Sequence, residues 1–304
     1  MNLRLSPTAE AGWRARLTLD FKASAGRTFL ARRKHEGPLV VQRAFHPEGD
    51  GVAHVYLLHP PGGVVGGDEL VLEAHVGEGA HALLTTPGAT KLYRSGGPTA
   101  ALQNTLRVAK GAVVEWFPQE TIVFSGARAA QSLSVELESS ASGPQGTFVG
   151  WDIVCLGRPG SGETFARGHY VSRIQLQRGT TPLYLERLEV EGGTAFQEAA
   201  WGLRGAPVLG TFFASVTAER WSRALESIET MRATLTPSTV NGEWLGLTAL
   251  ATPAPLETPR SGTLVGRYLG PSAERAKAFF IELWRALRPL LLGRPALPPR
   301  IWAT

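Results

Sequence analysis

A glycine-rich stretch carries the residues whose types and spacing most suggest chemistry, His59-Pro-Pro-Gly-Gly-Val-Val-Gly-Gly-Asp-Glu-Leu70. Its four glycines allow positive φ angles and a tight turn, which would present Asp68 and Glu69 at the start of a strand. The stretch lacks the Gly-Lys-Ser/Thr ending of a phosphate-binding loop and the GxGxxG spacing of a dinucleotide fold. The residues alone favour a turn capped by Asp68 over a ligand site.

Two further carboxylates interrupt apolar strands. Alternation places Asp152 on the face of Val154, opposite Trp151, and Glu186 on the face of Tyr184. Because both faces are apolar, each carboxyl group is expected to be partly buried, where it must find a cation or take up a proton. Each acid either pairs with an arginine or holds a metal cation through oxygen ligands. The arginines available for such pairing are Arg158, Arg173 and Arg187.

No motif marks a permanently bound metal or cofactor. The seven histidines form no HxxxH or HExxH pattern, and the single cysteine, Cys155, excludes CxxC sites and internal disulfides. We interpret the lone histidines as core or surface residues and Cys155 as a small buried apolar side chain.

A hydrolase or metal-dependent enzyme is the alternative function that the residues leave open. Glu115 and Glu120 are five residues apart and could act as paired acids, or Asp68 could hold a metal-bound water. The sequence contains no GxSxG motif, and spacing identifies no general base with an orienting partner.

Strands must position these side chains, because most of residues 10–215 consists of short alternating segments separated by turns. The regular spacing predicts a mainly β fold, with a large antiparallel β-sandwich or β-helical-like body. The absence of a Gly/Ser-rich linker predicts a single domain over residues 1–304.

Two segments have helical periodicity instead. Apolar residues at helical spacing predict helices over about 218–235 and about 272–288, the first beginning after a plausible N-cap. Pro289 and Gly293 are expected to close the second helix.

The composition bounds the remaining possibilities. The 304 residues are 43% hydrophobic and 19% charged, which suffices for a sizeable core. The net charge of +5 raises the question of nucleic acid, but the basic residues gather at both ends of the chain rather than in one aromatic-rich stripe. This favours a solvated surface or an acidic protein partner. Without a signal-peptide core or an apolar run of 18 residues, a cytoplasmic protein without membrane contact is expected.

Several motifs follow one another from about residue 12 to the end of the chain. The glycine-rich stretch 59–70 is followed by Thr86-Pro-Gly-Ala-Thr-Lys-Leu-Tyr-Arg-Ser95, Glu115-Trp-Phe-Pro-Gln-Glu120, Trp151-Asp-Ile-Val-Cys-Leu-Gly-Arg-Pro159, Gly162-Glu-Thr-Phe165, Leu185-Glu-Arg-Leu188, Leu283-Trp-Arg-Ala-Leu-Arg-Pro289 and Pro299-Arg-Ile-Trp-Ala-Thr304. In this order they resemble the UreD family of urease accessory proteins, called UreH in some organisms. The family is described as largely β with two helices, in agreement with the periodicity.

The resemblance implies a non-catalytic role, the insertion of nickel into the metallocentre of apo-urease. In that scheme the D protein is a scaffold that binds apo-urease and the helical accessory protein UreF. UreF recruits the GTPase UreG, and the carrier UreE supplies the metal; a dimer of the complex is possible. The missing phosphate-binding loop fits, because GTP hydrolysis would belong to the partner.

The resemblance also implies a polar route through which Ni²⁺ passes in transit. By its motifs we place Asp68, Asp152 and Glu186 along the route, with Glu69, Tyr93 and Glu163 as secondary candidates. Carboxylate oxygens bind Ni²⁺ less tightly than thiolate or imidazole clusters, and several weak sites in a row let an ion leave as well as enter. We therefore prefer a conduit to a static scaffold.

The expected C-terminal helix carries an aromatic face that has two interpretations. It either docks UreF or urease, where central aromatics contribute strongly to binding, or it closes the β body. The residues of this face are Phe279, Phe280, Leu283 and Trp284.

Overall fold

Burial along the strands divides them into two kinds. The computed structural model describes residues 12–140, 143–235, 242–253 and 260–303. Strands such as β1 (Arg14–Ser24) and β5 (Glu69–Val76) bury mainly alternate residues, so one face meets the core and the other meets solvent. In contrast, β12 (Thr147–Arg158) and β16 (Val208–Val216) are buried almost continuously, which requires cover on both faces.

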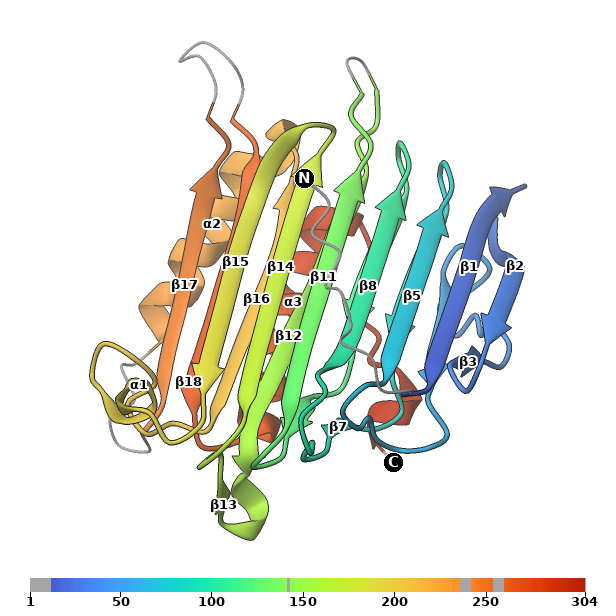
Figure 1. Ribbon diagram of the computed structural model, residues 1–304. Coiled ribbons are helices and arrows are strands. Elements are labelled where there is room, and N and C mark those ends of the chain that lie inside the picture. Colours follow the sequence, from blue (N-terminus) through green and yellow to red (C-terminus); the bar gives the residue numbers. More distant parts are fainter. Residues whose placement is uncertain (1–11, 141–142, 236–241, 254–259, 304) are drawn as a thin grey trace.

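The strands form two sheets that lie face to face (Figure 1). The first sheet has the order β15 (Thr181–Glu191), β14 (His169–Arg178), β11 (Arg128–Leu137), β8 (Ala100–Val108), β5, β1 and β2 (Arg27–Glu36). The second has the order β17 (Trp244–Ala251), β18 (Gly262–Gly270), β16, β12, β9 (Val113–Phe117), β6 (His81–Thr85), β4 (Ala53–Leu58) and β3 (Val40–Val41). Attached to the second sheet are β7 (Thr90–Leu92), β10 (Thr121–Val123) and β13 (Glu163–Thr164).

The chain winds between the sheets as a coil. Leaving aside the short β7, β10 and β13, the strands from β4 to β14 lie alternately in the second and the first sheet, so neighbours such as β5 and β8, or β6 and β9, run parallel. Antiparallel pairs flank these parallel runs, for example β1 with β2, β14 with β15 and β12 with β16. The predicted mainly β fold is confirmed, but the predicted antiparallel pairing is wrong for the coil. Neighbouring strands run parallel from β1 to β14 in the first sheet and from β4 to β12 in the second. Each parallel crossover is a strand of the opposite sheet, so the residue pattern is the same as in a hairpin series.

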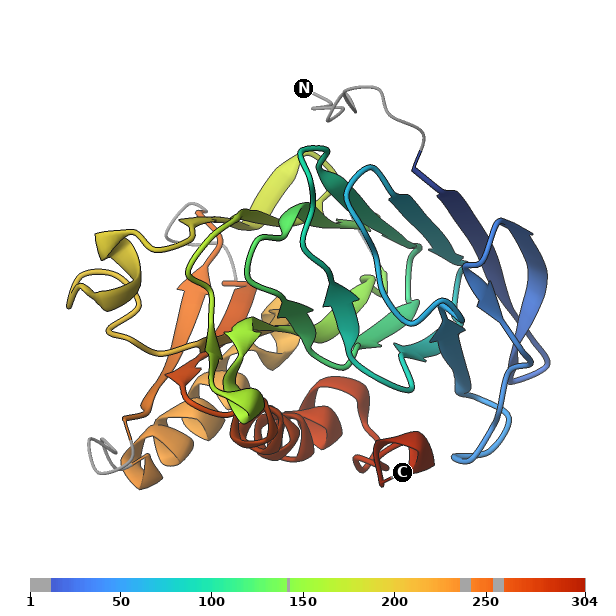
Figure 2. The ribbon, with the colours of Figure 1, turned by 60° about the horizontal axis from the view of Figure 1, so that its bottom comes forward.

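Helices cover the outer face of the second sheet (Figure 2). The two predicted helices are α2 (Ala218–Thr234) and α3 (Ala273–Leu292). A short helix, α1 (Ala195–Glu198), and two 3₁₀ turns, η1 (Pro159–Ser161) and η3 (Arg300–Ala303), complete the described elements. Within the described residues, no helix is long and apolar enough to cross a lipid bilayer. The predicted domain limits, residues 1 and 304, lie outside the described ranges.

The helix α3 begins and ends through local chemistry. The Ser272 hydroxyl oxygen accepts the N–H of Arg275 at 3.3 Å, which caps the first turn. The prediction that Pro289 closes this helix is wrong, because α3 continues past it and ends at Gly293, whose φ is 67°. The apolar side of the last turn packs against the second sheet, and this packing outweighs the N–H that proline lacks.

The proposed docking face on α3 belongs to the core. Phe280, Leu283 and Trp284 have no exposed surface, and Phe279 is half-buried. The ring of Phe280 lies 6.3 Å from that of Trp151, on the outer face of the second sheet. The docking interpretation is therefore wrong for these three side chains, because the apolar outer face of the sheet needs them as cover.

A buried ionic cluster ties α3 to the second sheet. Glu115 of β9 accepts hydrogen bonds from Arg288 at 2.8–3.2 Å, from Trp284 at 2.6 Å and from His81 at 2.7 Å. Glu48 accepts from Arg288 at 2.6 and 2.8 Å. Burial by itself would raise the pKa of Glu115, but His81 and Arg288 overcome it and lower the pKa to about 2. Glu115 is therefore a structural carboxylate that stays ionised.

We predict that Glu115→Gln lowers the free energy of unfolding by about 3–5 kcal/mol at pH 7, because it leaves part of the buried Arg288 charge unpaired. Denaturant unfolding measures the loss. The contribution of Glu115 is present above the ordinary pKa of 4.5 and declines as the pH falls toward 2. The control is Glu282→Gln, since Glu282 forms an exposed pair with Arg285 on the same helix and should change stability by less than about 0.5 kcal/mol. Equal losses in both variants would contradict the assignment.

Candidate functional site between the two sheets

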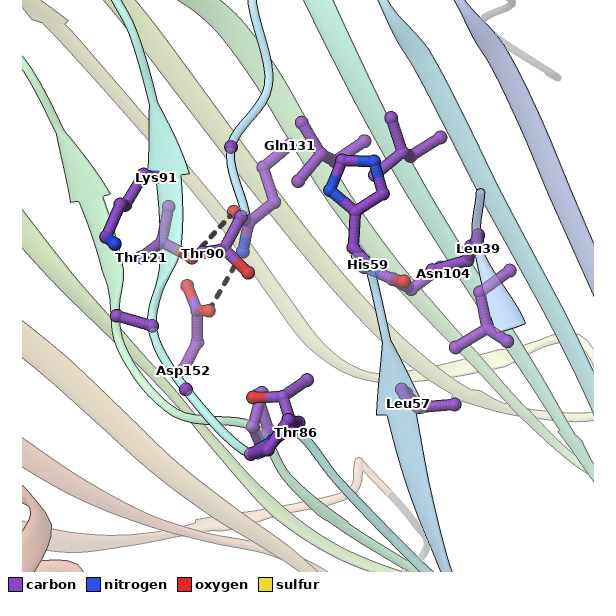
Figure 3. Close-up of a pocket in the computed structure, with 18 of the residues that line it drawn as sticks. Leu39, Leu57, His59, Thr86, Thr90, Lys91, Asn104, Thr121, Gln131 and Asp152 are labelled. Atoms are coloured by element: carbon purple, nitrogen blue, oxygen red, sulfur yellow. Dashed lines mark hydrogen bonds between the residues drawn. The ribbon is translucent and has the colours of Figure 1, made fainter. Parts of the chain in front are cut away.

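A cavity of about 350 Å³ lies between the two sheets. The first sheet contributes Asn104 and Gln131 to its wall, and the second contributes Asp152, while Thr121 of β10 lies beside them (Figure 3). Segments 59–63 and 86–91 close it on another side. Leucines supply most of the remaining wall: Leu39, Leu57, Leu70, Leu72, Leu102 and Leu133. A few polar groups therefore face one another inside an otherwise apolar shell, as is typical of binding cavities.

Asp152 is the acid that this cavity contains. Its neighbour Trp151 packs toward the helices and Val154 packs between the sheets, as the alternation predicted. Gln131 Nε2 donates to Asp152 Oδ1 at 2.9 Å, and no arginine or lysine of the described residues forms an ion pair with it. Burial, together with the nearby charge of Glu186, raises the pKa of Asp152 to about 7, although the hydrogen bond from Gln131 opposes the shift. The carboxyl group therefore titrates near neutral pH.

A neutral polar network holds Asp152 in place. Gln131 Oε1 accepts from the Thr121 hydroxyl at 3.3 Å and from the Tyr170 hydroxyl at 3.5 Å, which turns the amide N–H group toward Asp152. Burial raises the pKa of Tyr170 well above its ordinary value, so the phenol stays protonated. Gln131 is not among the predicted site residues, although a polar residue at a buried position of β11 was an available signal.

Glu186 borders a second cavity, of about 460 Å³, between β15 and strands β16–β18. Its Oε2 lies 2.6 Å from Arg267 Nη2 and also accepts the hydroxyl of Tyr184. Because Glu186 also acts on the charge state of Asp152, the structure brings these two predicted acids together from opposite sheets.

The arginines that pair with these acids differ from the expected ones. Arg267 pairs with Glu186, whereas Arg158 pairs with Glu163 at 2.7 Å and Arg187 pairs with Glu189. The expected pairing of Asp152 with an arginine is wrong as well. Spacing along the sequence favours nearby arginines, but Arg267 reaches Glu186 only because the two sheets face each other.

Asp68 has the role of a turn cap. Its Oδ1 accepts the N–H of Trp13 and its Oδ2 accepts the N–H of Val65, both at 2.9 Å, and only 8% of the residue is exposed. A side chain at Gly66 would collide with Ser95, so the loop also needs its glycines. The structure therefore does not bring Asp68 into the cavity with Asp152.

The secondary candidates lie apart from both cavities. Glu69 pairs with Arg14 at 3.4 Å on the surface, and Glu163 is held by Arg158. The ring of Tyr93 packs edge-on against Phe124 with 4.9 Å between centroids. None of the three lines either cavity.

His59 is a cavity residue that the sequence analysis did not single out. Its imidazole lies in the cavity wall (Figure 3), and its ring nitrogens bond to no other described residue. Burial lowers its pKa, although the charge of Asp68 opposes this, so the imidazole is neutral at pH 7 and free to donate a lone pair. The signal that could have found it is its position at the end of β4, directly before the glycine-rich loop.

The enzyme alternative loses its proposed acids. Glu115 lies on the helix side of the second sheet with both oxygens engaged, and neither Glu115 nor Glu120 lines a cavity described above. Asp68 is occupied by backbone N–H groups. Burial raises the pKa of Cys155 to about 12, which agrees with its interpretation as a small buried apolar side chain. Among the described residues there is no group of three or more His, Cys, Asp and Glu that could hold a metal.

We predict that Asp152→Asn stabilises the fold at pH 8 by about 2–4 kcal/mol, because the ionised carboxylate is buried without a cation. The folded pKa of about 7 exceeds the ordinary 3.8, so wild-type stability falls as the pH rises from about 4 to about 7. Denaturant unfolding at pH 5 and pH 8 measures this, and the advantage of the variant should fall by about half or more at pH 5. Asp50→Asn at an exposed position is the control. An advantage that does not change with pH would contradict the placement.

We predict that Asp68→Ala costs about 1–3 kcal/mol of unfolding free energy, because two backbone N–H groups lose their acceptor. Hydrogen exchange should show lost protection at Trp13 and Val65. The adjacent Glu69→Ala removes only a surface pair and should cost less than about 1 kcal/mol. Equal costs for the two variants would argue against the capping role.

Comparisons with known proteins agree with the motif order. A family model described as UreD urease accessory protein matches residues 13–303. A urease accessory protein UreD from Azoarcus sp. (strain BH72) is 45% identical over 303 residues, which cover 100% of this chain and 98% of the relative. One from Dechloromonas aromatica (strain RCB) is 41% identical, with 98% of this chain and 97% of the relative covered. The chain belongs to the UreD family of urease accessory proteins.

Proposed function

We propose that this protein is a non-catalytic subunit of a cytoplasmic complex that inserts nickel into apo-urease, and that Ni²⁺ passes between its two sheets. Family membership gives the protein a role in urease maturation together with other maturation factors and urease. The finer assignment adds UreF as direct partner, the GTPase UreG recruited through UreF, and Ni²⁺ as the cargo.

The observation that carries the proposal is the environment of Asp152. A carboxyl group faces an internal cavity, has no cationic partner among the described residues and titrates at about pH 7. A divalent cation would replace the proton and remove the cost of burying the charge. The Asp152 carboxyl group bonds to one amide, and two hydroxyls bond to that amide in turn. With no second carboxylate in this network, such a site holds a metal weakly, as transit requires.

Glu186 and His59 extend the route in two directions. Glu186 lies toward the second cavity, close enough to influence Asp152, and His59 lies in the opposite wall of the first cavity. Imidazole nitrogen favours Ni²⁺ over Mg²⁺ and Ca²⁺, which prefer oxygen ligands. We propose that Ni²⁺ moves between His59, Asp152 and Glu186 as successive weak ligands.

We predict that Asp152→Asn and Glu186→Gln each lower the nickel content of co-produced urease roughly tenfold. Metal analysis of the purified urease measures the effect, and co-purification of UreF checks that the complex still forms. Glu189→Gln on the same strand as Glu186 removes an exposed carboxylate and should leave the nickel content unchanged. Normal nickel content in the Asp152→Asn/Glu186→Gln double variant would exclude the conduit and leave a scaffold.

A further inference from the structure

A row of side chains crosses the second sheet between the two cavities. Asp152 of β12 lies opposite Thr211 of β16, which lies opposite Arg267 of β18, and Gly246 of β17 completes the row. Residues in register on neighbouring strands point to the same side of a sheet. The row therefore faces the first sheet, with Asp152 in the first cavity and Arg267 in the second.

Arg267 connects this row to the first sheet. Its Nη1 donates to the Thr211 hydroxyl at 2.9 Å, and its Nη2 donates to the Tyr184 hydroxyl at 2.7 Å and lies 2.6 Å from Glu186 Oε2. Tyr184 and Glu186 belong to β15, at the margin of the first sheet. The guanidinium of Arg267, on the second sheet, thus holds the carboxylate of Glu186, on the first sheet.

The acidic and basic groups around Glu186 differ in number and in how far they are exposed to solvent. Two carboxyl groups, Asp152 and Glu186, lie at this end, and Arg267 forms an ion pair with Glu186 but not with Asp152. The side chain of Glu186 is 15% exposed and that of Arg267 is 49% exposed, so the guanidinium lies on the solvent side of the carboxylate. A cation that travels past Asp152 toward Glu186 meets a positive charge already in its place.

Arg267 also has space into which it can move. It lines the second cavity, and the neighbouring position on β17 is Gly246, where even an added Cβ would lie 3.7 Å from the Cβ of Arg267. Outward rotation of the guanidinium would break its contacts to Thr211, Tyr184 and Glu186 without displacing the backbone. Because all three partners are on strands, they would stay in place after it leaves.

We propose that Arg267 is an internal counter-ion that closes this end of the route until a divalent cation displaces it from Glu186. The inference rests on the proposed function and names the residue that controls release. A guanidinium at 2.6 Å and a divalent cation compete for the same carboxylate, because their mutual repulsion excludes joint binding. Arg267 therefore keeps affinity for Ni²⁺ low in the resting protein.

Calorimetric titration of the full-length chain with NiCl₂ at pH 7.5 tests the proposal. Arg267→Met keeps most of the length of the side chain without its charge, and should bind Ni²⁺ about ten- to a hundredfold more tightly than wild type. The size of this gain follows from the effect of an adjacent cation on a carboxylate, which changes its affinity for a proton by a similar factor. Arg267→Lys should stay near wild type. Arg267→Met/Glu186→Gln should lose the gain, because the carboxylate freed by the first change is then absent.

Two further variants guard against an effect of misfolding. Thr211→Val is isosteric, loosens the guanidinium while keeping its charge, and should raise the affinity several-fold. Arg107→Met removes an arginine from an exposed cross-strand pair with Glu136 at 3.1 Å and should change nothing. No gain in either folded variant, Arg267→Met or Thr211→Val, overturns the counter-ion. If Asp152→Asn and Glu186→Gln each bind Ni²⁺ as tightly as wild type, the proposed route itself is overturned rather than the role of Arg267.

Discussion

Burial of the second sheet on both faces is the constraint on which the rest of the structure depends. The first sheet covers one side and α2 and α3 cover the other, so a charged side chain near the middle of this sheet must find its partner inside the protein. Two acids show the two outcomes. Glu115 points to the helices, is met by Arg288 and has a pKa of about 2, whereas Asp152 points to the first sheet, meets an amide and has a pKa of about 7.

The two sides of the second sheet therefore differ in how their charges are compensated. The helix side is closed by ion pairs and stacked aromatic rings, and its charges are matched within the protein. The side that faces the first sheet keeps a carboxyl group whose charge is unmatched, next to cavities of about 350 and 460 Å³. An unmatched buried charge reduces stability unless a ligand supplies the counter-charge, and for this reason we propose that the cation passes on this side.

Local pattern was sufficient for much of the fold. Alternation correctly separated Asp152 from Trp151, and helical periodicity located α2 and α3 to within a few residues. Local pattern gave the wrong prediction where packing against a distant part of the chain decides the structure. Pro289 lies inside α3 because the last turn of the helix still packs its apolar side against the second sheet. Phe280, Leu283 and Trp284 point inward because the surface of that sheet is apolar.

The sequence by itself determined the strands, the two main helices, the faces on which the acids lie and, through the order of its motifs, the family. Each of these depends on neighbours within a few positions or on identity at aligned positions. Only the tertiary structure decided that strands such as β5 and β8 run parallel, that Asp68 also accepts the N–H of the distant Trp13, and that Glu186 meets Arg267 rather than a nearby arginine. These contacts join residues 55 to 83 positions apart in cases such as Trp13 with Asp68 and Tyr184 with Arg267. Strand alternation sets which way a side chain points, but the winding of the chain between two sheets sets what it meets there.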